Sequence, residues 1–430
     1  MTQGVRHNRL VGYGVVTSAY WSFMLTDGAL RMLILLNFHE RGFSPILLAF
    51  LFLLYEFMGV ITNLLAGWVV GRFGLNRTLF LGLGLQVVAL TLLGIANPAT
   101  IGLASVLIVV VLQGLSGIAK DLTKLSAKSA LKRLAPDTSQ GETWLLVWVA
   151  RLTGSKNAIK GLGFFLGAAL LQAIGFQVTL AVLAIGLTLV LVGALVSMPS
   201  GLNGNKDPAL PFTAVFSNSS GVNRLSLARF FLFSARDVWF VVGVPLFFYA
   251  QGWTFQMVGT FMAIWIIGYG FVQAATPNIL RRRFLAQERD PTAKSTNTLS
   301  FAVGALRLWG ALPCLALLVL AGTVPIVPLD NLLPVIALGL FVFGAFFAVN
   351  SALHSFLILA YSEAEDVALD VGFYYMSNAG GRLVGTFLSG LIFQCFGGQL
   401  GTMGLIACLA TAALFSLVAW MLAFGLPRSD

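Results

Sequence analysis

Charged residues are scarce in this sequence of 430 residues: they make up 10% of it, where a soluble domain carries about 25%. Hydrophobic residues reach 58%, and the mean hydropathy is +0.90. Apolar blocks of about 20 residues or more recur along the chain, long enough to cross a bilayer core of roughly 30 Å. The composition therefore excludes an ordinary soluble domain and predicts an all-α membrane protein within the lipid bilayer.

Cysteine is also scarce, and Cys314, Cys395 and Cys408 all lie in apolar segments. They form no disulfide or metal-binding pattern and are expected to be small buried hydrophobic residues. The sequence shows no phosphate-binding loop and no nucleophile–base constellation. We therefore expect no cofactor, no metal site and no enzyme. No large soluble domain is present to relay a signal, which disfavours a receptor, and the N-terminal stretch does not resemble a cleavable signal peptide.

The apolar blocks divide into twelve expected transmembrane segments. Between the sixth and seventh lies a stretch rich in Gly, Pro, Ser and Asn, "SMPSGLNGNKDPALPFTAVFSNSSG", which is typical of a linker. We expect an N-terminal six-helix bundle over 1–198, a cytoplasmic linker over 199–222 and a C-terminal six-helix bundle over 223–430. The twelve expected segments are 12–38, 45–70, 77–96, 99–134, 141–174, 177–198, 224–250, 255–279, 298–321, 331–361, 367–396 and 400–425.

Basic residues of the connecting loops fall almost entirely on one side if both termini are cytoplasmic, as the positive-inside rule requires. This bias and an anionic substrate explain the net charge of +10 better than nucleic-acid binding does. The two halves also repeat. An offset of 222 residues pairs Lys160 with Arg382, and an offset of 210 residues pairs Asp27 with Asp237. Duplicated halves around a midplane substrate site are how secondary transporters of this size are built.

The stretch "GWVVGRFGLNR" (67–77) resembles the loop between helices two and three of the major facilitator superfamily. That loop carries Gly-x-x-x-Asp-Arg-x-Gly-x-x-Arg. Gly67, Arg72, Gly74 and Arg77 match this gating motif, whereas Gly71 replaces the Asp, which weakens the charge-relay role of the motif. Of the fourth-helix pattern Arg-x-x-Gln-Gly, Gln113 and Gly114 are present, but Val110 replaces the Arg. The resemblance implies twelve helices in two pseudo-symmetric bundles.

Five longer blocks are similar to the organoarsenical efflux permeases of bacterial arsenic operons (ArsJ-type). They are "LTDGALRMLILLNFHERGFSP", "YEFMGVITNLLAGW", "LSGIAKDLTKLSAKS", "LTGSKNAIKGLGFFLG" and "FSARDVWFVVGVPLF". The resemblance implies export of 1-arseno-3-phosphoglycerate, which a glyceraldehyde-3-phosphate dehydrogenase makes from arsenate. It also implies a bacterial cytoplasmic membrane, with the dehydrogenase as a functional partner that forms no stable complex. We expect a monomer.

Ionisable residues inside membrane segments are costly, so each is a candidate functional residue. In "TDGALRM", Asp27 and Arg31 are four residues apart on one helical face. They form either a pair that neutralises itself or a cavity-facing Arg31 that Asp27 holds. Lys156 and Lys160 share a face of the fifth segment, roughly 22 Å from an end, which is too deep to reach water easily. Gly161, Gly163 and Gly167 suit close helix packing there.

The fourth segment carries a lysine at every fourth position from Lys120 to Lys132. We expect Lys120 and Lys124 to contact substrate, and Lys128 and Lys132 to lie at the cytoplasmic rim, where lysines extend to water. Asp121 points about 100° away from Lys120, so we expect it to pair with another basic residue.

In the second half, Arg229 and Arg236 share a face, and Asp237 repeats Asp27. By analogy with glycerol-phosphate antiporters of the superfamily, Arg31 and Arg236 would grip a phosphate. Glu56 either couples protons or is a counter-ion for a neighbouring lysine. Asn63, Asn350 and His354 are weaker candidates.

Seven deep basic residues outnumber four deep acidic ones, which favours an anionic substrate bound by Arg forks and Lys point charges. The predicted function is alternating-access efflux of the arsenylated glycerate, coupled to protons. An organophosphate–phosphate antiporter without an arsenic role is the alternative. The basic residues are Arg31, Lys120, Lys124, Lys156, Lys160, Arg236 and Arg382, and the acidic ones, with charge-pairing or proton-coupling roles, are Asp27, Glu56, Asp121 and Asp237.

Overall fold

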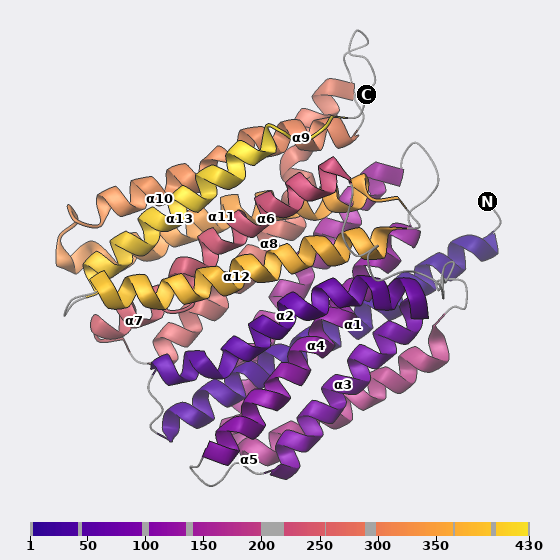
Figure 1. Cartoon of the computed structure of the whole chain (residues 1–430), viewed down its shortest axis with the longest axis horizontal. Helices are drawn as coiled ribbons and strands as arrows, with labels where there is room; N and C mark the ends of the chain where they lie inside the picture. The colour runs from indigo at the N-terminus through magenta and orange to yellow at the C-terminus, as the bar shows by residue number, and fades with distance from the viewer. Residues whose placement is uncertain are drawn as a thin grey trace. The chain divides into compact units, whose positions relative to one another are not determined.

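Thirteen α-helices and no strand make up the described part of the computed structural model (Figure 1). The structure describes residues 3–41, 45–96, 103–134, 141–198, 219–253, 255–288, 298–363, 366–396 and 401–428. The predicted all-α architecture is confirmed. The helices are α1 (Gln3–Glu40), α2 (Pro45–Phe73), α3 (Leu75–Ala96), α4 (Leu103–Leu134), α5 (Gly141–Ser197), α6 (Ser220–Phe240), α7 (Gly243–Ala250), α8 (Phe255–Glu288), α9 (Thr298–Trp309), α10 (Ala311–Thr323), α11 (Leu329–Tyr361), α12 (Val367–Phe396) and α13 (Thr402–Ala423).

Within the described residues, nine helical stretches are long and apolar enough to cross a membrane. A tenth, shorter apolar stretch, Leu51–Leu65, lies in α2. The other two predicted segments lie in α1 and in the first part of α5, which are long helices with several charged residues. The chain is thus a multi-pass membrane protein.

Three glycine or proline positions explain where the helices break. Gly74 ends α2 with φ +90°, and Gly175 has φ +75° inside α5, both in a region that only glycine enters readily. The turn at Gly175 separates the predicted segments 141–174 and 177–198. Pro313 in α10 has no N–H to donate to the carbonyl of Trp309, and the side-chain amide of Asn350 donates to that carbonyl instead, at 2.9 Å. Asn350, a weaker candidate for function, thus replaces the hydrogen bond that the helix lacks at Pro313.

At the break between α6 and α7, a side chain again bonds to backbone groups that have no partner within the helix. The hydroxyl of Ser389 on α12 accepts hydrogen bonds from the backbone N–H groups of Val242 and Gly243, at 3.2 and 3.0 Å. In a membrane these donors have no water to bond, so a protein acceptor is needed.

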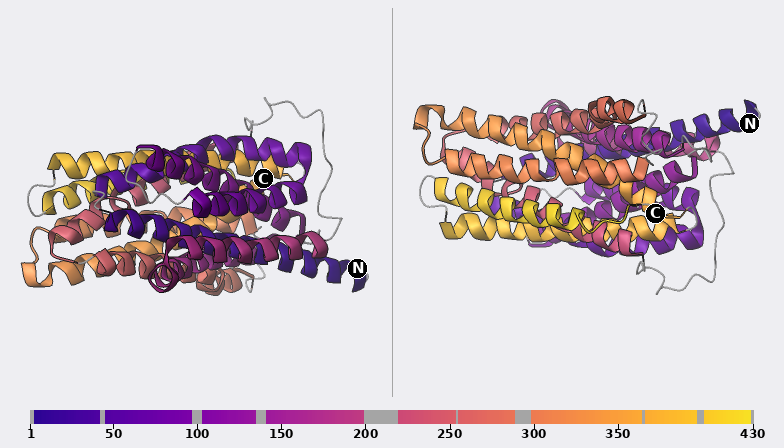
Figure 2. Two further views of the ribbon diagram at one scale, coloured as in Figure 1. Left: turned by 90° about the horizontal axis from the view of Figure 1, so that it is seen from below. Right: turned by 90° about the horizontal axis from the view of Figure 1, so that it is seen from above.

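The chain forms two compact units, in each of which the long helices run alongside one another (Figure 2). The predicted division at the linker stays a prediction, because residues 199–218 of the linker lie outside the described residues. Each unit also includes a segment from outside its predicted half. Unit 1 comprises the described residues within Met1–Thr138, Lys156–Ser217 and Ser362–Met376, and unit 2 those within Ser139–Ser155, Asn218–Tyr361 and Ser377–Asp430.

The centres of the two units differ in chemistry. Unit 2 has an aromatic core, in which Trp239 packs edge to face on Trp265 and Phe343, and Trp265 stacks on Tyr269. Unit 1 instead holds a group of buried and partly buried charged side chains from five helices: α1, α2, α4, α5 and α12. Burying a charge inside a membrane protein costs free energy unless the charge is paired, so these residues are the candidates for a functional site.

Candidate functional site

An ion pair joins α1 to α5 in the interior of unit 1. The ammonium of Lys160 lies 2.5 Å from Oδ2 of Asp27, and the hydroxyl of Tyr55 on α2 donates to Oδ1 at 2.6 Å. Asp27 is 2% exposed. Both carboxylate oxygens therefore have a hydrogen-bond donor, which a buried carboxylate requires.

Small residues let α1 and α5 approach closely enough for this pair. A Cβ on Gly163 would overlap the backbone of α1 at Leu25, and a Cβ on Gly167 would lie 2.5 Å from the carbonyl oxygen of Ala29. A Cβ on Gly28 would overlap the carbonyl of Lys160. The predicted close packing at Gly163 and Gly167 is confirmed, and it places the Lys160 stem directly beside α1.

Arg31, one helical turn after Asp27, takes a partner from α2. Its guanidinium lies 3.2 Å from Oε1 of Glu56 and above the rings of Phe52 and Tyr55. One of the two interpretations of the sequence pairs Asp27 with Arg31, whereas each has a partner on another helix. Sequence spacing fixes which residues share a face of one helix, but packing decides which helix faces it. Glu56 is a counter-ion to Arg31, whereas the predicted counter-ion role named a lysine as its partner.

On α4, Asp121 lies between two lysines. Its carboxylate is 2.5 Å from the ammonium of Lys124 and 3.7 Å from that of Lys120. The pairing with Lys124 is as expected, and the additional contact with Lys120 differs from our expectation. Both lysines also lie over aromatic rings: Lys120 is 3.9 Å from the ring centroid of Tyr55, and Lys124 is 4.2 Å from that of Tyr375.

The prediction that Lys128 lies at a solvated rim is wrong. Lys128 is 0% exposed, and its ammonium lies 5.4 Å from the ring centroid of Tyr375. Tyr375 lies in the part of α12 that belongs to unit 1. Lys132 is partly exposed, as are Lys156 and Lys160 on α5. The lysine stripe of α4 thus extends as a buried feature from Lys120 to Lys128.

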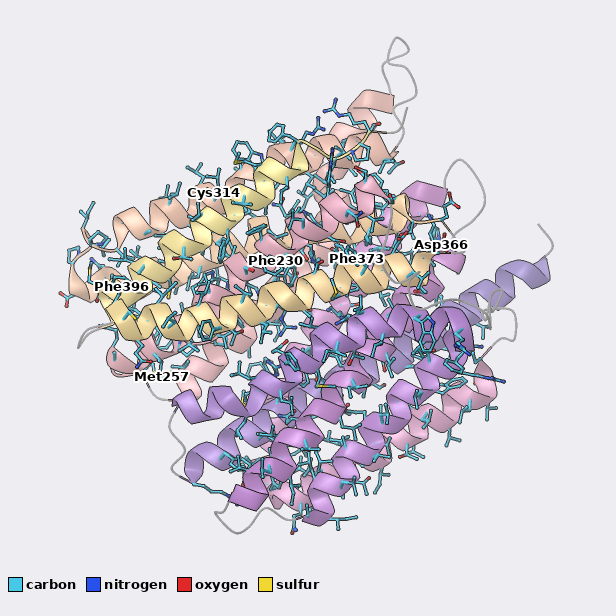
Figure 3. All side chains as sticks on the ribbon, viewed as in Figure 1. Phe230, Met257, Cys314, Asp366, Phe373 and Phe396 are labelled. Carbon is cyan, nitrogen blue, oxygen red and sulfur yellow. The ribbon has the colours of Figure 1, made fainter. Side chains whose placement is uncertain are left out.

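Unit 2 repeats the arrangement of the first ion pair. The carboxylate of Asp237 on α6 accepts hydrogen bonds from Nε of Arg382 on α12, at 3.2 Å, and from Nε of Arg236, at 2.5 Å. Asp237 and Arg382 are the residues that the sequence repeat pairs with Asp27 and Lys160. Glycines again bring the helices together: a Cβ on Gly381 would overlap the backbone of Phe230, which Figure 3 labels on α6. The sequence repeat therefore corresponds to a repeated ion pair.

A second polar group in unit 2 surrounds Arg229, which is 3% exposed. Its Nε donates to Asn378 at 2.8 Å and its Nη1 to the hydroxyl of Ser351 at 3.0 Å, and its guanidinium lies 3.9 Å from the ring centroid of Phe233. Tyr269 and Gln273 on α8 also hydrogen bond to Ser351. His354 on α11, a weaker candidate, is buried near Arg229. Asn63 on α2, another weaker candidate, donates a hydrogen bond to the carbonyl of Gly59 in its own helix.

The motif residues lie at the end of α2 and the start of α3. Gly67 is helical, Arg72 is exposed with its guanidinium 5.2 Å from the ring centroid of Trp68, and Arg77 is exposed in the first turn of α3. Gly74 makes the turn between the helices, with φ +90°. The motif therefore has a clear structural role at Gly74, and its gating role stays a prediction.

Sequence reasoning missed three residues of the charged interior. Tyr55 bonds to Asp27 and packs on two cations, Tyr375 packs on two lysines, and Asp370 is buried in the first turn of α12. A tyrosine in an apolar segment carries no charge signal, and Asp370 follows "SEAED", a stretch typical of a solvated loop. Within the described residues, no three His, Cys, Asp or Glu side chains could hold a metal ion.

Basic groups outnumber acidic groups in the interior of unit 1. Six cations, Arg31, Lys120, Lys124, Lys128, Lys156 and Lys160, accompany four carboxylates, Asp27, Glu56, Asp121 and Asp370. Such a surplus in a low-dielectric setting attracts an anion and repels a cation. The roles of these residues in binding or proton coupling stay predictions.

Comparisons with known proteins place the chain in a family. A model described as the Major Facilitator Superfamily matches residues 15–306, and no curated protein matches. The structure is similar to the human organic anion transporter MFSD10, with a TM-score of 0.70, 16% identity and coverage of 96% of this chain and 99% of that one.

Two bacterial structures are also similar. An outward-facing bacterial homologue of the iron transporter ferroportin gives a TM-score of 0.74 at 11% identity, over 96% of this chain and 98% of that one. The E. coli fucose:proton symporter FucP gives a TM-score of 0.67 at 13% identity, over 98% of this chain and 100% of that one. At these identities the likeness shows the fold alone. Because the family model covers more than half of the sequence, and the fold agrees with it, the chain belongs to the major facilitator superfamily of transporters.

Proposed function

We propose that this transporter exports an anionic organoarsenical, 1-arseno-3-phosphoglycerate, across a bacterial cytoplasmic membrane. The observation that supports an anionic substrate is the surplus of cations over carboxylates among the buried and partly buried charged residues of unit 1, above all Lys120 and Lys124 around the single carboxylate of Asp121. A doubly charged phosphate and a carboxylate would complete the neutralisation of such a group.

The arsenical identity rests on the resemblance to ArsJ-type permeases. Its blocks include the residues of the unit 1 charge group: "LTDGALRM" holds Asp27 and Arg31, "LSGIAKDLTKLSAKS" holds Lys120 to Lys128, and "LTGSKNAIKG" holds Lys156 and Lys160. In this proposal a glyceraldehyde-3-phosphate dehydrogenase supplies the substrate without forming a stable complex, and the transporter works as a monomer. The structural likeness to an organic anion transporter is compatible with an anionic substrate.

Transport proceeds by alternating access, in which the two halves rock around a midplane site. Lys120, Lys124, Lys156 and Lys160 would hold the anion, and Arg31, Arg236 and Arg382 would supply guanidinium groups to it. Asp27, Glu56, Asp121 and Asp237 would pair with these cations when the anion is absent. Proton antiport through these carboxylates is the proposed source of energy. If the anion entered inside-out vesicles equally fast after the proton gradient was collapsed, this coupling would be wrong.

Arsenate tolerance tests the substrate. An arsenate-sensitive bacterium expresses this chain alone, the dehydrogenase alone, or both. Tolerance that needs both proteins supports export of the arsenylated glycerate, and no gain with both contradicts it. The alternative, an organophosphate–phosphate antiporter, predicts phosphate-driven exchange of 3-phosphoglycerate in proteoliposomes and no arsenate tolerance.

A further inference from the structure

Tyr55 on α2 contacts charged residues of both α1 and α4 in unit 1. It is 1% exposed. Its hydroxyl donates to Asp27 at 2.6 Å, and Asp27 in turn holds Lys160. Its ring lies against two cations, with Lys120 Nζ at 3.9 Å and Arg31 Cζ at 4.7 Å from the centroid. Tyr55 thus contacts α1 and α4 directly, and α5 only through Asp27.

The surface of α4 is shaped to receive this ring. A Cβ on Gly117 would lie 2.9 Å from the carbonyl oxygen of Tyr55 and 3.3 Å from its ring carbon Cδ2. Any larger residue would push the ring away from α4, and Lys120 follows Gly117 by nearly one helical turn. Glycine at 117 therefore sets the contact between the Tyr55 ring and the Lys120 ammonium.

The Lys120 ammonium has donors to spare. Its ammonium lies over the ring of Tyr55 and 3.7 Å from the carboxylate of Asp121, which is beyond hydrogen-bond distance, and it also interacts electrostatically with Asp27. Lys124 occupies the other oxygen of that carboxylate at 2.5 Å. An ammonium carries three N–H donors, and burial makes donors without acceptors costly. Lys120 is only 7% exposed, so a substrate anion is the acceptor that this position suits.

We propose that Tyr55 is the positioning residue of the anion site. Its ring keeps the Lys120 ammonium from forming a hydrogen bond with Asp121. The three N–H donors of that ammonium therefore stay available to a phosphate or carboxylate of the substrate. Its hydroxyl keeps Asp27 on Lys160, which prevents that carboxylate from neutralising Lys120 in place of the substrate. This inference rests on the proposed anion transport and adds the residue that keeps the site open.

Binding of 3-phosphoglycerate to the full-length protein in lipid nanodiscs tests the inference. Tyr55→Met fills the space without a ring and is expected to weaken binding about tenfold, the effect of losing a desolvated cation–π contact. Tyr55→Phe keeps the ring and is expected to stay within about threefold of wild type. In a Lys120→Met background, Tyr55→Met is expected to cause no further loss, because the ring acts through Lys120.

Controls separate this role from a structural one. Ser416→Ala removes a buried hydroxyl of unit 2 that has no hydrogen-bond partner in the described structure, and is expected to leave binding unchanged. Gly117→Ala, which displaces Tyr55 by a different route, is expected to weaken binding only while Lys120 is present. Wild-type binding by Tyr55→Met, or an equal loss with and without Lys120, overturns the inference but leaves the proposed function standing. Failure of the wild type to bind 3-phosphoglycerate or inorganic phosphate overturns both.

Discussion

The carboxylate of Asp27 on α1 lies 2.5 Å from the ammonium of Lys160 on α5. Its counterpart in the other half, Asp237 on α6, accepts the guanidinium of Arg382 on α12 at 3.2 Å. The same residue positions thus form the same helix contact in both repeats, once with lysine and once with arginine. An ion pair retained across a duplication and placed in the interior of each unit holds two helices together, and we expect it to open when a substrate anion competes for the cation.

Removing one partner of this pair is expected to destabilise the protein. Asp27→Asn leaves the Lys160 ammonium, which is only partly exposed, without its carboxylate, at a cost of up to about 3–5 kcal/mol. The double variant Asp27→Asn/Lys160→Met should recover much of the loss, because both charges are gone. Thermal unfolding of the purified variants measures this, and an Asp27→Asn variant as stable as wild type would contradict it.

Close packing of α1 on α5 should make Gly163 intolerant of even one methyl group. A Cβ there overlaps the backbone of Leu25, so Gly163→Ala is expected to lower the unfolding temperature and to weaken the Asp27–Lys160 contact. On the same helix, a Cβ added to Gly186 would meet nothing within 4 Å. Gly186→Ala should therefore be neutral or stabilising by up to about 1 kcal/mol. Equal effects of the two substitutions would rule out the packing explanation.

Ser389 is expected to matter for the α6–α7 break. Ser389→Ala removes the acceptor of two backbone N–H groups, at Val242 and Gly243, and should cost about 1–3 kcal/mol. Ser416→Ala is the matched control, because its buried hydroxyl has no hydrogen-bond partner in the described structure. Unfolding by heat in one detergent compares the two, and a larger loss for Ser416→Ala would argue against this account.

The sequence predicted the helices well because membrane segments need long apolar runs, and these are local features. The repeat in the sequence also matched Asp27 with Asp237 and Lys160 with Arg382, because the duplication keeps the spacing, but it did not predict that each carboxylate pairs with the basic residue of the other helix. It did not predict that Arg31 contacts Glu56, since the partner lies on another helix and the choice depends on packing.

The sequence did not predict the burial of Lys128, for a related reason. Apolar run length placed it near the end of a membrane segment, where lysines reach water, but it is 0% exposed and its ammonium lies beside the ring of Tyr375 on α12. Tyr55 gave no signal because an aromatic residue in an apolar helix is ordinary. Only the positions of Asp27, Arg31 and Lys120 around it mark it as part of the site.

Transport by reconstituted protein tests the central claim, that the cationic group of unit 1 binds the exported anion. Inside-out proteoliposomes with a proton gradient are supplied with 1-arseno-3-phosphoglycerate, made continuously by a glyceraldehyde-3-phosphate dehydrogenase. Uptake is measured for wild type, Lys124→Ala and Lys156→Ala. The account predicts uptake by the wild type and a loss of about tenfold or more in each variant, at unchanged protein content. Undiminished uptake by both variants would contradict it.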